Sequence, residues 1–224
     1  MHNLTRPSAI LFDLDGTLVD SAPDLTAALV DALAPLGVTC SEADVRSWVG
    51  RGAKVLVERA LASKRPDLLP VGVDQTLLAF LEAYSDHNGE AARCYAGVKE
   101  TLFALKASDV TLAVVTNKPI RFVPELLERL GIRGVFDVLV GGDSTSARKP
   151  DPEPLLETCA TLGVNARDCW MVGDSANDAD AAHAIDMPFI WMTYGYHGGA
   201  TADELRPTLA LDRFDALTTL VENC

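Results

Sequence analysis

Two carboxylates stand two positions apart where an apolar run near the start of the chain ends. Residues 9–12 are apolar and lead directly into Asp13-Leu14-Asp15-Gly16. In an extended strand, residues i and i+2 share a face, so Asp13 and Asp15 point the same way. Two such carboxylates repel each other unless a cation lies between them, and Mg²⁺ favours oxygen ligands. The spacing therefore predicts metal-assisted chemistry, with Gly16 allowing a sharp exit from the strand.

This motif alone has a second interpretation, because an ordinary strand can also end in solvated acidic residues. The later strand ends help to decide. Further candidate site residues stand there, namely Thr116, Asn117, Lys149, Asp174 and Asp178. A hydroxyl and an amide can donate to phosphate oxygens, and a lysine supplies a compact positive charge.

Each of these residues also has a purely structural interpretation. Thr116 could cap a helix, Lys149 could be a surface charge, and Asp174 could be an N-cap residue. Their joint placement argues against coincidence, because open α/β sheets bind ligands in the crevice at the carboxyl ends of their strands. Together they predict a site for a phosphate group.

The apolar segments and the stretches between them have the pattern of a parallel α/β domain. Candidate strands cover residues 9–14, 111–116, 135–140, 168–172 and 189–192, and candidate crossover helices cover residues 119–130, 152–162 and 175–185. Strands of this length and β-branched content are typical of sheets covered by helices on both faces. We therefore expect an α/β fold with a doubly wound, Rossmann-like parallel sheet.

The pattern changes between the first strand and the rest of the predicted sheet. Amphipathic helical stretches lie near residues 24–36, 41–49, 53–63 and 74–88, with no convincing strand between them. Such an insert is expected to form a small all-helical cap domain above the strand ends. The predicted division is a catalytic core at residues 1–20 and 93–224, and a helical cap domain at residues 21–92.

The composition narrows the classes of function. Of 224 residues, 48% are hydrophobic, yet the apolar stretches are far shorter than the about 20 residues that cross a bilayer. A net charge of −13 without a basic stripe disfavours nucleic acid and membranes as partners, and any phosphate site then needs local cations or a metal. The five cysteines form no C-x-x-C pair and the histidines are scattered, so no zinc site is expected. We expect a cytoplasmic protein, since the run from residue 9 is too short for a signal-peptide core.

The motifs at the strand ends resemble those of the haloacid dehalogenase superfamily. The resemblance covers the whole chain, including the helical insert, and rests on Asp13-x-Asp15-Gly16-Thr17, Thr116-Asn117, Lys149-Pro150 and Gly173-Asp174-x-x-x-Asp178. It implies a phosphatase in which Asp13 attacks phosphorus and Asp15 protonates the leaving alcohol. Asp15 would then deprotonate the water that hydrolyses the acyl phosphate.

The same resemblance implies roles for the surrounding residues. Mg²⁺ would be held by the Asp13 carboxylate, the Asp15 backbone carbonyl and Asp174. Lys149 would neutralise charge, and Asp178 would orient Lys149 or the metal's waters. In the core, the residues assigned to substrate binding are Asp15, Gly16, Thr116, Asn117 and Lys149.

Two further segments, residues 18–23 and 193–196, resemble bacterial phosphoglycolate phosphatases. This implies a small phosphorylated metabolite as the partner, 2-phosphoglycolate first of all; we expect a monomer or homodimer. In the cap, Arg51 and Gly52 lie in a loop that leads into a helix, where Arg51 or Lys54 could pair with a substrate carboxylate. Lys54 fits an ordinary surface charge better. Because related sequences carry less basic residues here, the exact substrate stays open.

Single residues argue against some of the other functions found among similar proteins. Asp15 argues against a dehalogenase, because an ester intermediate with a halide leaving group needs no acid there. Sugar-phosphate mutases keep both aspartates but usually have another residue at Thr17. A receiver-like phosphoaspartate switch is much shorter, and the insert argues for turnover. A phosphatase for another small metabolite and a mutase stay open as alternatives.

Overall fold

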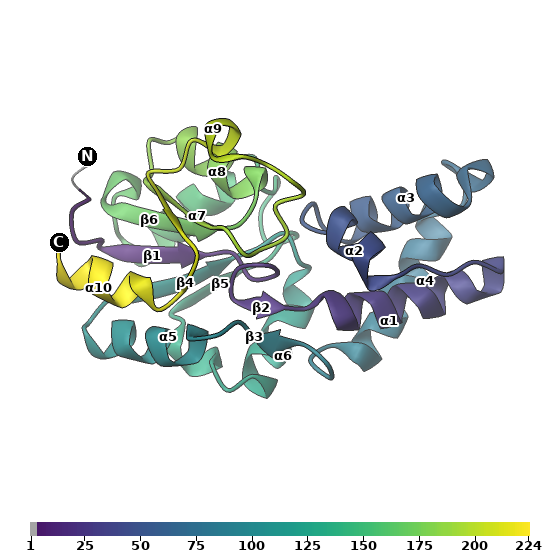
Figure 1. The fold of residues 1–224 in the computed structure, drawn as a ribbon, viewed down its shortest axis with the longest axis horizontal. Helices are drawn as coiled ribbons and strands as arrows, with labels where there is room; N and C mark the ends of the chain where they lie inside the picture. The colour runs from purple at the N-terminus through teal and green to yellow at the C-terminus, as the bar shows by residue number, and fades with distance from the viewer. Residues whose placement is uncertain (1–3) are drawn as a thin grey trace.

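The structure, a computed structural model, describes residues 4–224, so residues 1–3 of the predicted core segment lie outside the described residues. Its main feature is a six-stranded sheet with the order β5-β4-β1-β6-β7-β8, in which every pairing is parallel (Figure 1). The strands are β1 (Ala9–Phe12), β4 (Thr111–Val115), β5 (Val138–Val140), β6 (Cys169–Gly173), β7 (Phe189–Met192) and β8 (Leu209–Leu211). The doubly wound α/β fold predicted from the sequence is confirmed.

Side chains that alternate along β1 explain why helices cover both faces of the sheet. Ile10 and Phe12 belong to one buried cluster, whereas Ala9 and Leu11 belong to another, as the period of two in a strand requires. Helices α5 (Val98–Ala107), α6 (Val123–Arg129) and α10 (Ala216–Glu222) contribute to the first cluster, and α7 (Glu153–Leu162), α8 (Ala176–His183) and α9 (Ala202–Leu205) contribute to the second.

Four helices lie to one side of the sheet (Figure 1), and their apolar side chains pack together. They are α1 (Ala22–Leu33), α2 (Glu42–Trp48), α3 (Ala53–Lys64) and α4 (Val73–His87). The third buried cluster consists of their side chains and the loops between them, with Phe122 as its one member from the core part. The division at residues 21–92 stays a prediction, and this separate cluster supports it.

A short two-stranded ribbon connects these helices to the sheet. Strand β2 (Val19–Asp20) pairs antiparallel with β3 (Arg93–Cys94), so the chain leaves and re-enters the core at neighbouring positions. The buried Asp24 carboxylate accepts the backbone N–H groups of Gly89, Ala91 and Ala92. These bonds fix the start of α1 against the segment that follows α4.

The sequence pattern placed most elements within a few residues, and the differences have local causes. Residues 135–140 form a strand only at β5, because a short 3-10 helix (Arg133–Val135) precedes it. Residues 119–130 begin as a 3-10 helix (Ile120–Phe122) before α6, which carries Pro124 in its first turn. Within residues 4–224, no helix is both long and apolar enough to cross a membrane.

Candidate active site

Asp13 lies where the central strand ends. Strand β1 is bordered by β4 and β6, and the Asp13 N–H continues the ladder by donating to the Val172 carbonyl at 2.9 Å. Its carboxylate oxygen Oδ1 accepts the Leu14 N–H at 2.7 Å and lies 3.1 Å from the Lys149 ammonium. Among the described residues, no hydrogen bond is formed to Oδ2. One oxygen of Asp13 is therefore held in place while the other stays available for reaction.

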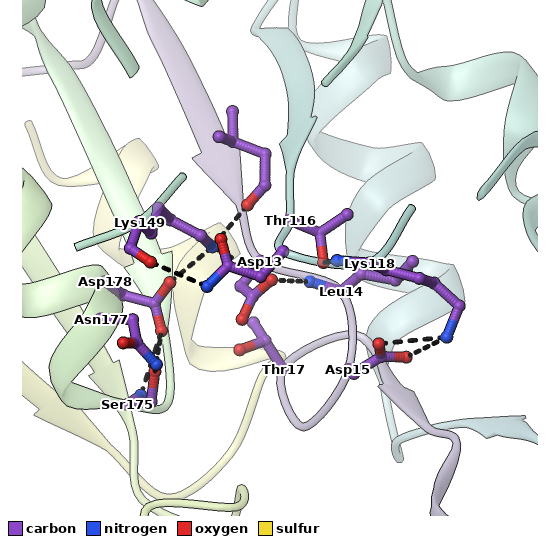
Figure 2. Close-up of polar contacts among 12 residues, drawn as sticks. Asp13, Leu14, Asp15, Thr17, Thr116, Lys118, Lys149, Ser175, Asn177 and Asp178 are labelled. Carbon is purple, nitrogen blue, oxygen red and sulfur yellow. Dashed lines mark hydrogen bonds and ion pairs between the residues drawn. The ribbon is translucent and has the colours of Figure 1, made fainter. Parts of the chain in front are cut away.

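Lys149 lies inside the protein, among negative groups. Its ammonium contacts Asp178 Oδ1 at 2.7 Å (Figure 2). It also donates to the Val115 carbonyl at 2.5 Å. Burial lowers the pKa of Lys149, but Asp13 and Asp178 outweigh that effect and hold the pKa above its usual value. The side chain is therefore a fixed positive charge beside Asp13.

Three buried carboxylates cluster here, and two of them contact Lys149. Asp13, Asp174 and Asp178 are buried, and each offers an oxygen within 4.8 Å of the others. Asp174 accepts from the Thr17 hydroxyl and the Tyr196 N–H, both at 2.7 Å. Burial raises the pKa of Asp13 to about 6, and burial with the neighbouring Asp13 and Asp178 raises that of Asp174 well above its usual value.

This excess of negative charge fits a divalent cation. Three clustered carboxylates with one lysine are unfavourable by themselves, and a hard cation with oxygen ligands would relieve their repulsion. The cluster contains the Asp13 and Asp174 carboxylates of the predicted ligand set and adds the Asp178 carboxylate. The Asp15 backbone carbonyl remains the predicted third ligand.

The Asp15 carboxylate points away from Asp13 (Figure 2), in contrast to the shared direction expected from strand alternation. Its two carboxylate oxygens lie 3.0 and 3.1 Å from the Lys118 ammonium, and Oδ1 also accepts from the Ser21 hydroxyl at 2.6 Å. Figure 2 shows Asp15 with Lys118 on one side of Asp13, and Asp178 with Lys149 on the opposite side. The next residue, Gly16, has φ of 94°, and a Cβ there would lie 2.5 Å from Asp174 Oδ2. Only glycine fits this turn without displacing Asp174.

The loop after β4 brings two more predicted residues to the site. Thr116 is 4% exposed and borders the same cavity as Asp13; its hydroxyl accepts the Lys118 N–H at 3.2 Å. The Asn117 side chain instead donates to two backbone carbonyls, of Gly50 at 3.1 Å and of Lys149 at 2.9 Å. The Asn117 amide therefore joins the loop after β4 to the helical insert.

A cavity opens between the strand ends and the helical insert. It encloses about 490 Å³, part of it open to solvent. Its polar lining includes Asp13, Asp15, Thr116, Asn117 and Lys118, and the apolar lining comes mainly from α1, α3, α4 and the loop before α3. Among the described residues that line it, Lys118 carries the only positive charge.

The predicted cap residues divide between the cavity and the surface. Gly52 lines the cavity, whereas Arg51 is exposed and does not belong to the lining. Lys54 is also exposed and pairs with Asp74 at 3.4 Å. The predicted contact between Arg51 and a substrate stays a prediction, and the structure places this side chain outside the cavity.

Sequence reasoning missed a second group of residues at the site. The sequence did not predict Lys118 as a site residue, although it directly follows Thr116 and Asn117, because a lysine after a strand end is usually exposed. Tyr84 lies on the apolar face of a helix and was indistinguishable from ordinary core. Asn177, which donates to the Gly50 carbonyl at 3.2 Å, was passed over between Asp174 and Asp178.

Known proteins are similar to this chain in sequence and in fold. The profile of the family described as "Haloacid dehalogenase-like hydrolase" matches residues 10–192. The chain is 42% identical over 213 residues to a phosphoglycolate phosphatase of Psychrobacter arcticus, covering 93% of each chain. It is 44% identical over 211 residues to phosphoglycolate phosphatase 1 of Pseudomonas aeruginosa, covering 92% of this chain and 76% of that one.

A crystal structure is similar over nearly the full length. It is that of a predicted phosphoglycolate phosphatase from Haemophilus somnus 129pt, with a TM-score of 0.91 and 35% identity. The match covers 97% of this chain and 99% of the other. The resemblance found from the four sequence motifs is confirmed.

Proposed function

We propose that this chain, a phosphoric monoester hydrolase that belongs to the haloacid dehalogenase-like hydrolase family, hydrolyses 2-phosphoglycolate to glycolate and phosphate through a phosphoaspartate. The observation that carries the mechanism is the state of Asp13, one oxygen of which is held by Leu14 and Lys149 while its carboxylate lines the cavity. A carboxylate held in this way is positioned for in-line attack. The names of the similar proteins support the substrate.

In the first step, Asp13 Oδ2 forms a bond to phosphorus and the bond from phosphorus to the ester oxygen breaks. The departing oxygen keeps the electron pair and takes a proton from Asp15, which releases glycolate. In the second step, Asp15 accepts a proton from water, whose oxygen attacks phosphorus. The bond between phosphorus and Asp13 then breaks, restoring the carboxylate and releasing phosphate.

The residues around Asp13 stabilise the charge of the transferred group. Lys149 lies 3.1 Å from the nucleophile and would face the phosphoryl oxygens, together with the Thr116 hydroxyl. Asp13, Asp174 and the Asp15 carbonyl would hold Mg²⁺, with Asp178 beside them. When bound, this ion would neutralise carboxylate and phosphoryl charge.

A substrate panel tests the proposal. Phosphate release is measured with Mg²⁺ from 2-phosphoglycolate, phosphoserine, pyrophosphate, glucose phosphates and nucleoside monophosphates, and the assay is repeated with EDTA. We expect a strong preference for 2-phosphoglycolate, loss of activity in EDTA and recovery with added Mg²⁺. Even, weak turnover would contradict the substrate, full activity in chelator would contradict the metal, and interconversion of glucose phosphates without release would favour a mutase.

A further inference from the structure

Lys118 has a place in the cavity that the hydrolysis steps above leave unexplained. Its side chain is 3% exposed, and it carries the only positive charge among the described lining residues. A buried lysine keeps its charge only when an anion compensates for the lost hydration. Here that anion is Asp15, the residue that must be free to move a proton.

The surroundings of the ammonium group suit a second carboxylate. The Lys118 ammonium lies 4.6 Å from the centre of the Tyr84 ring. The Tyr84 hydroxyl is buried beside the Lys118 ammonium, and no acceptor among the described residues takes its O–H, so it is an unused donor in the cavity wall. Residues of the helical insert, from α1, α3, α4 and the loop before α3, form most of the remaining wall. A small anion that entered here would meet one charged donor and one neutral donor, with the Asp15 carboxylate as the anion it must displace.

We propose that Lys118 binds the carboxylate of the substrate and that this carboxylate replaces Asp15 as the partner of the ammonium group. This inference rests on the proposed function, because it concerns the part of 2-phosphoglycolate that does not react. The exchange is balanced in charge, since one carboxylate leaves the lysine as another arrives. Asp15, released as a carboxylate, takes up a proton from water and then turns toward the oxygen that departs from phosphorus, to which it gives that proton.

The exchange makes substrate selection part of the catalytic cycle. A phosphate ester without a carboxylate cannot replace Asp15 on the lysine, so breaking the pair would leave a buried charge without a partner. Such an ester is rejected even when its phosphoryl group fits. Specificity then follows from the residue that directly follows Thr116 and Asn117, rather than from an exposed residue of the insert.

The test compares 2-phosphoglycolate with ethyl phosphate, which has the same two-carbon leaving alcohol without the carboxylate. The variant is Lys118→Met, and the quantity is the ratio of kcat/KM for the two esters. We expect wild type to prefer 2-phosphoglycolate and Lys118→Met to lower that ratio by about 30-fold or more. Turnover of ethyl phosphate should change by a smaller factor than turnover of 2-phosphoglycolate, because ethyl phosphate lacks the carboxylate that Lys118 binds.

Matched variants separate this role from a structural one. Lys106→Met removes a lysine that contacts an aspartate at 2.7 Å outside the cavity, and it should leave the ratio unchanged. Tyr84→Phe should lower the ratio by a smaller factor, about 3-fold. If Lys118→Met fails to fold, as judged by circular dichroism, Lys118→Gln replaces it. The same fall in the ratio of kcat/KM is then expected.

Two results would overturn the inference and can be told apart. If wild type prefers 2-phosphoglycolate and the Lys118 variant keeps that preference, or loses activity on both esters by the same factor, the inference fails and the proposed function stands. If wild type shows no preference for the ester with the carboxylate, the proposed substrate fails and the inference fails with it.

Discussion

The two sides of the active site are built in different ways. On one side, Lys149 contacts the buried Asp13 and Asp178 carboxylates directly, and Asp174 offers an oxygen within 4.8 Å of both. On the other side, Lys118 and Asp15 face a cavity whose wall comes largely from the helical insert. In the mechanism proposed above, both sides act on the phosphoryl group, and Lys118 on the second side binds the part of the substrate that does not react. A substitution on the cavity side can therefore change the preferred substrate while the reaction at phosphorus stays the same.

Removing the charge on the core side should have the largest effect. In Lys149→Met, the Asp13 and Asp178 carboxylates lose a partner whose side chain is 1% exposed. We expect kcat to fall by about 10³-fold and the free energy of unfolding to fall by about 3 kcal/mol. Steady-state kinetics and urea denaturation measure the two quantities, with Lys106→Met as the control. Activity and stability equal to wild type would show that Lys149 is not the charge that holds this side together.

Loosening the connection between the two sides should have an intermediate effect. The Gly50 carbonyl accepts from both Asn117 and Asn177, at 3.1 and 3.2 Å, and so fixes the loop before α3 over the strand ends. Removing one of these bonds in Asn177→Ala should cost about 1 kcal/mol in stability. It should also lower kcat/KM for 2-phosphoglycolate by about 5-fold, mainly through KM. An unchanged KM with a large fall in kcat would instead assign Asn177 to the chemical steps.

The smallest effect is expected at the surface of the insert. Arg51 is exposed and lies outside the cavity lining, and an exposed charge contributes little to a distant interaction. Arg51→Gln should change kcat/KM for 2-phosphoglycolate by less than about 2-fold. A large rise in KM for this ester, without one for ethyl phosphate, would restore the contact predicted from the sequence and assign the substrate carboxylate to Arg51.

The sequence predicted the core side better than the cavity side for a physical reason. Asp13, Lys149 and Asp174 follow strands that are recognisable as apolar runs, and parallel strands bring their carboxyl ends to one edge. Lys118 meets Asp15 across 103 positions, and no periodic pattern records that pairing. The turn of the Asp15 carboxylate away from Asp13 depends on Lys118 and Ser21, so strand alternation alone could not predict it.

The same reasoning applies to the fold. The long amphipathic helices α1, α3 and α4 were predicted to within a few residues, because their apolar faces repeat with the helical period. Strand β8 was missed, since it spans only Leu209–Leu211 and none of its residues is fully buried. The pairing of β2 with β3 was also missed, because two residues in each strand give no periodicity to detect.

The nucleophilic role of Asp13 is tested most directly by looking for the phosphoryl group on that residue. Wild-type protein is mixed with 2-phosphoglycolate and Mg²⁺, quenched in acid during the first turnovers and digested for mass spectrometry. We predict the added mass of one phosphoryl group on the peptide that contains Asp13. In Asp13→Asn we predict no modified peptide and a fall in phosphate release of at least about 10⁴-fold, with an unchanged circular dichroism spectrum. Continued turnover by Asp13→Asn, or a phosphoryl group on another residue, would contradict the mechanism.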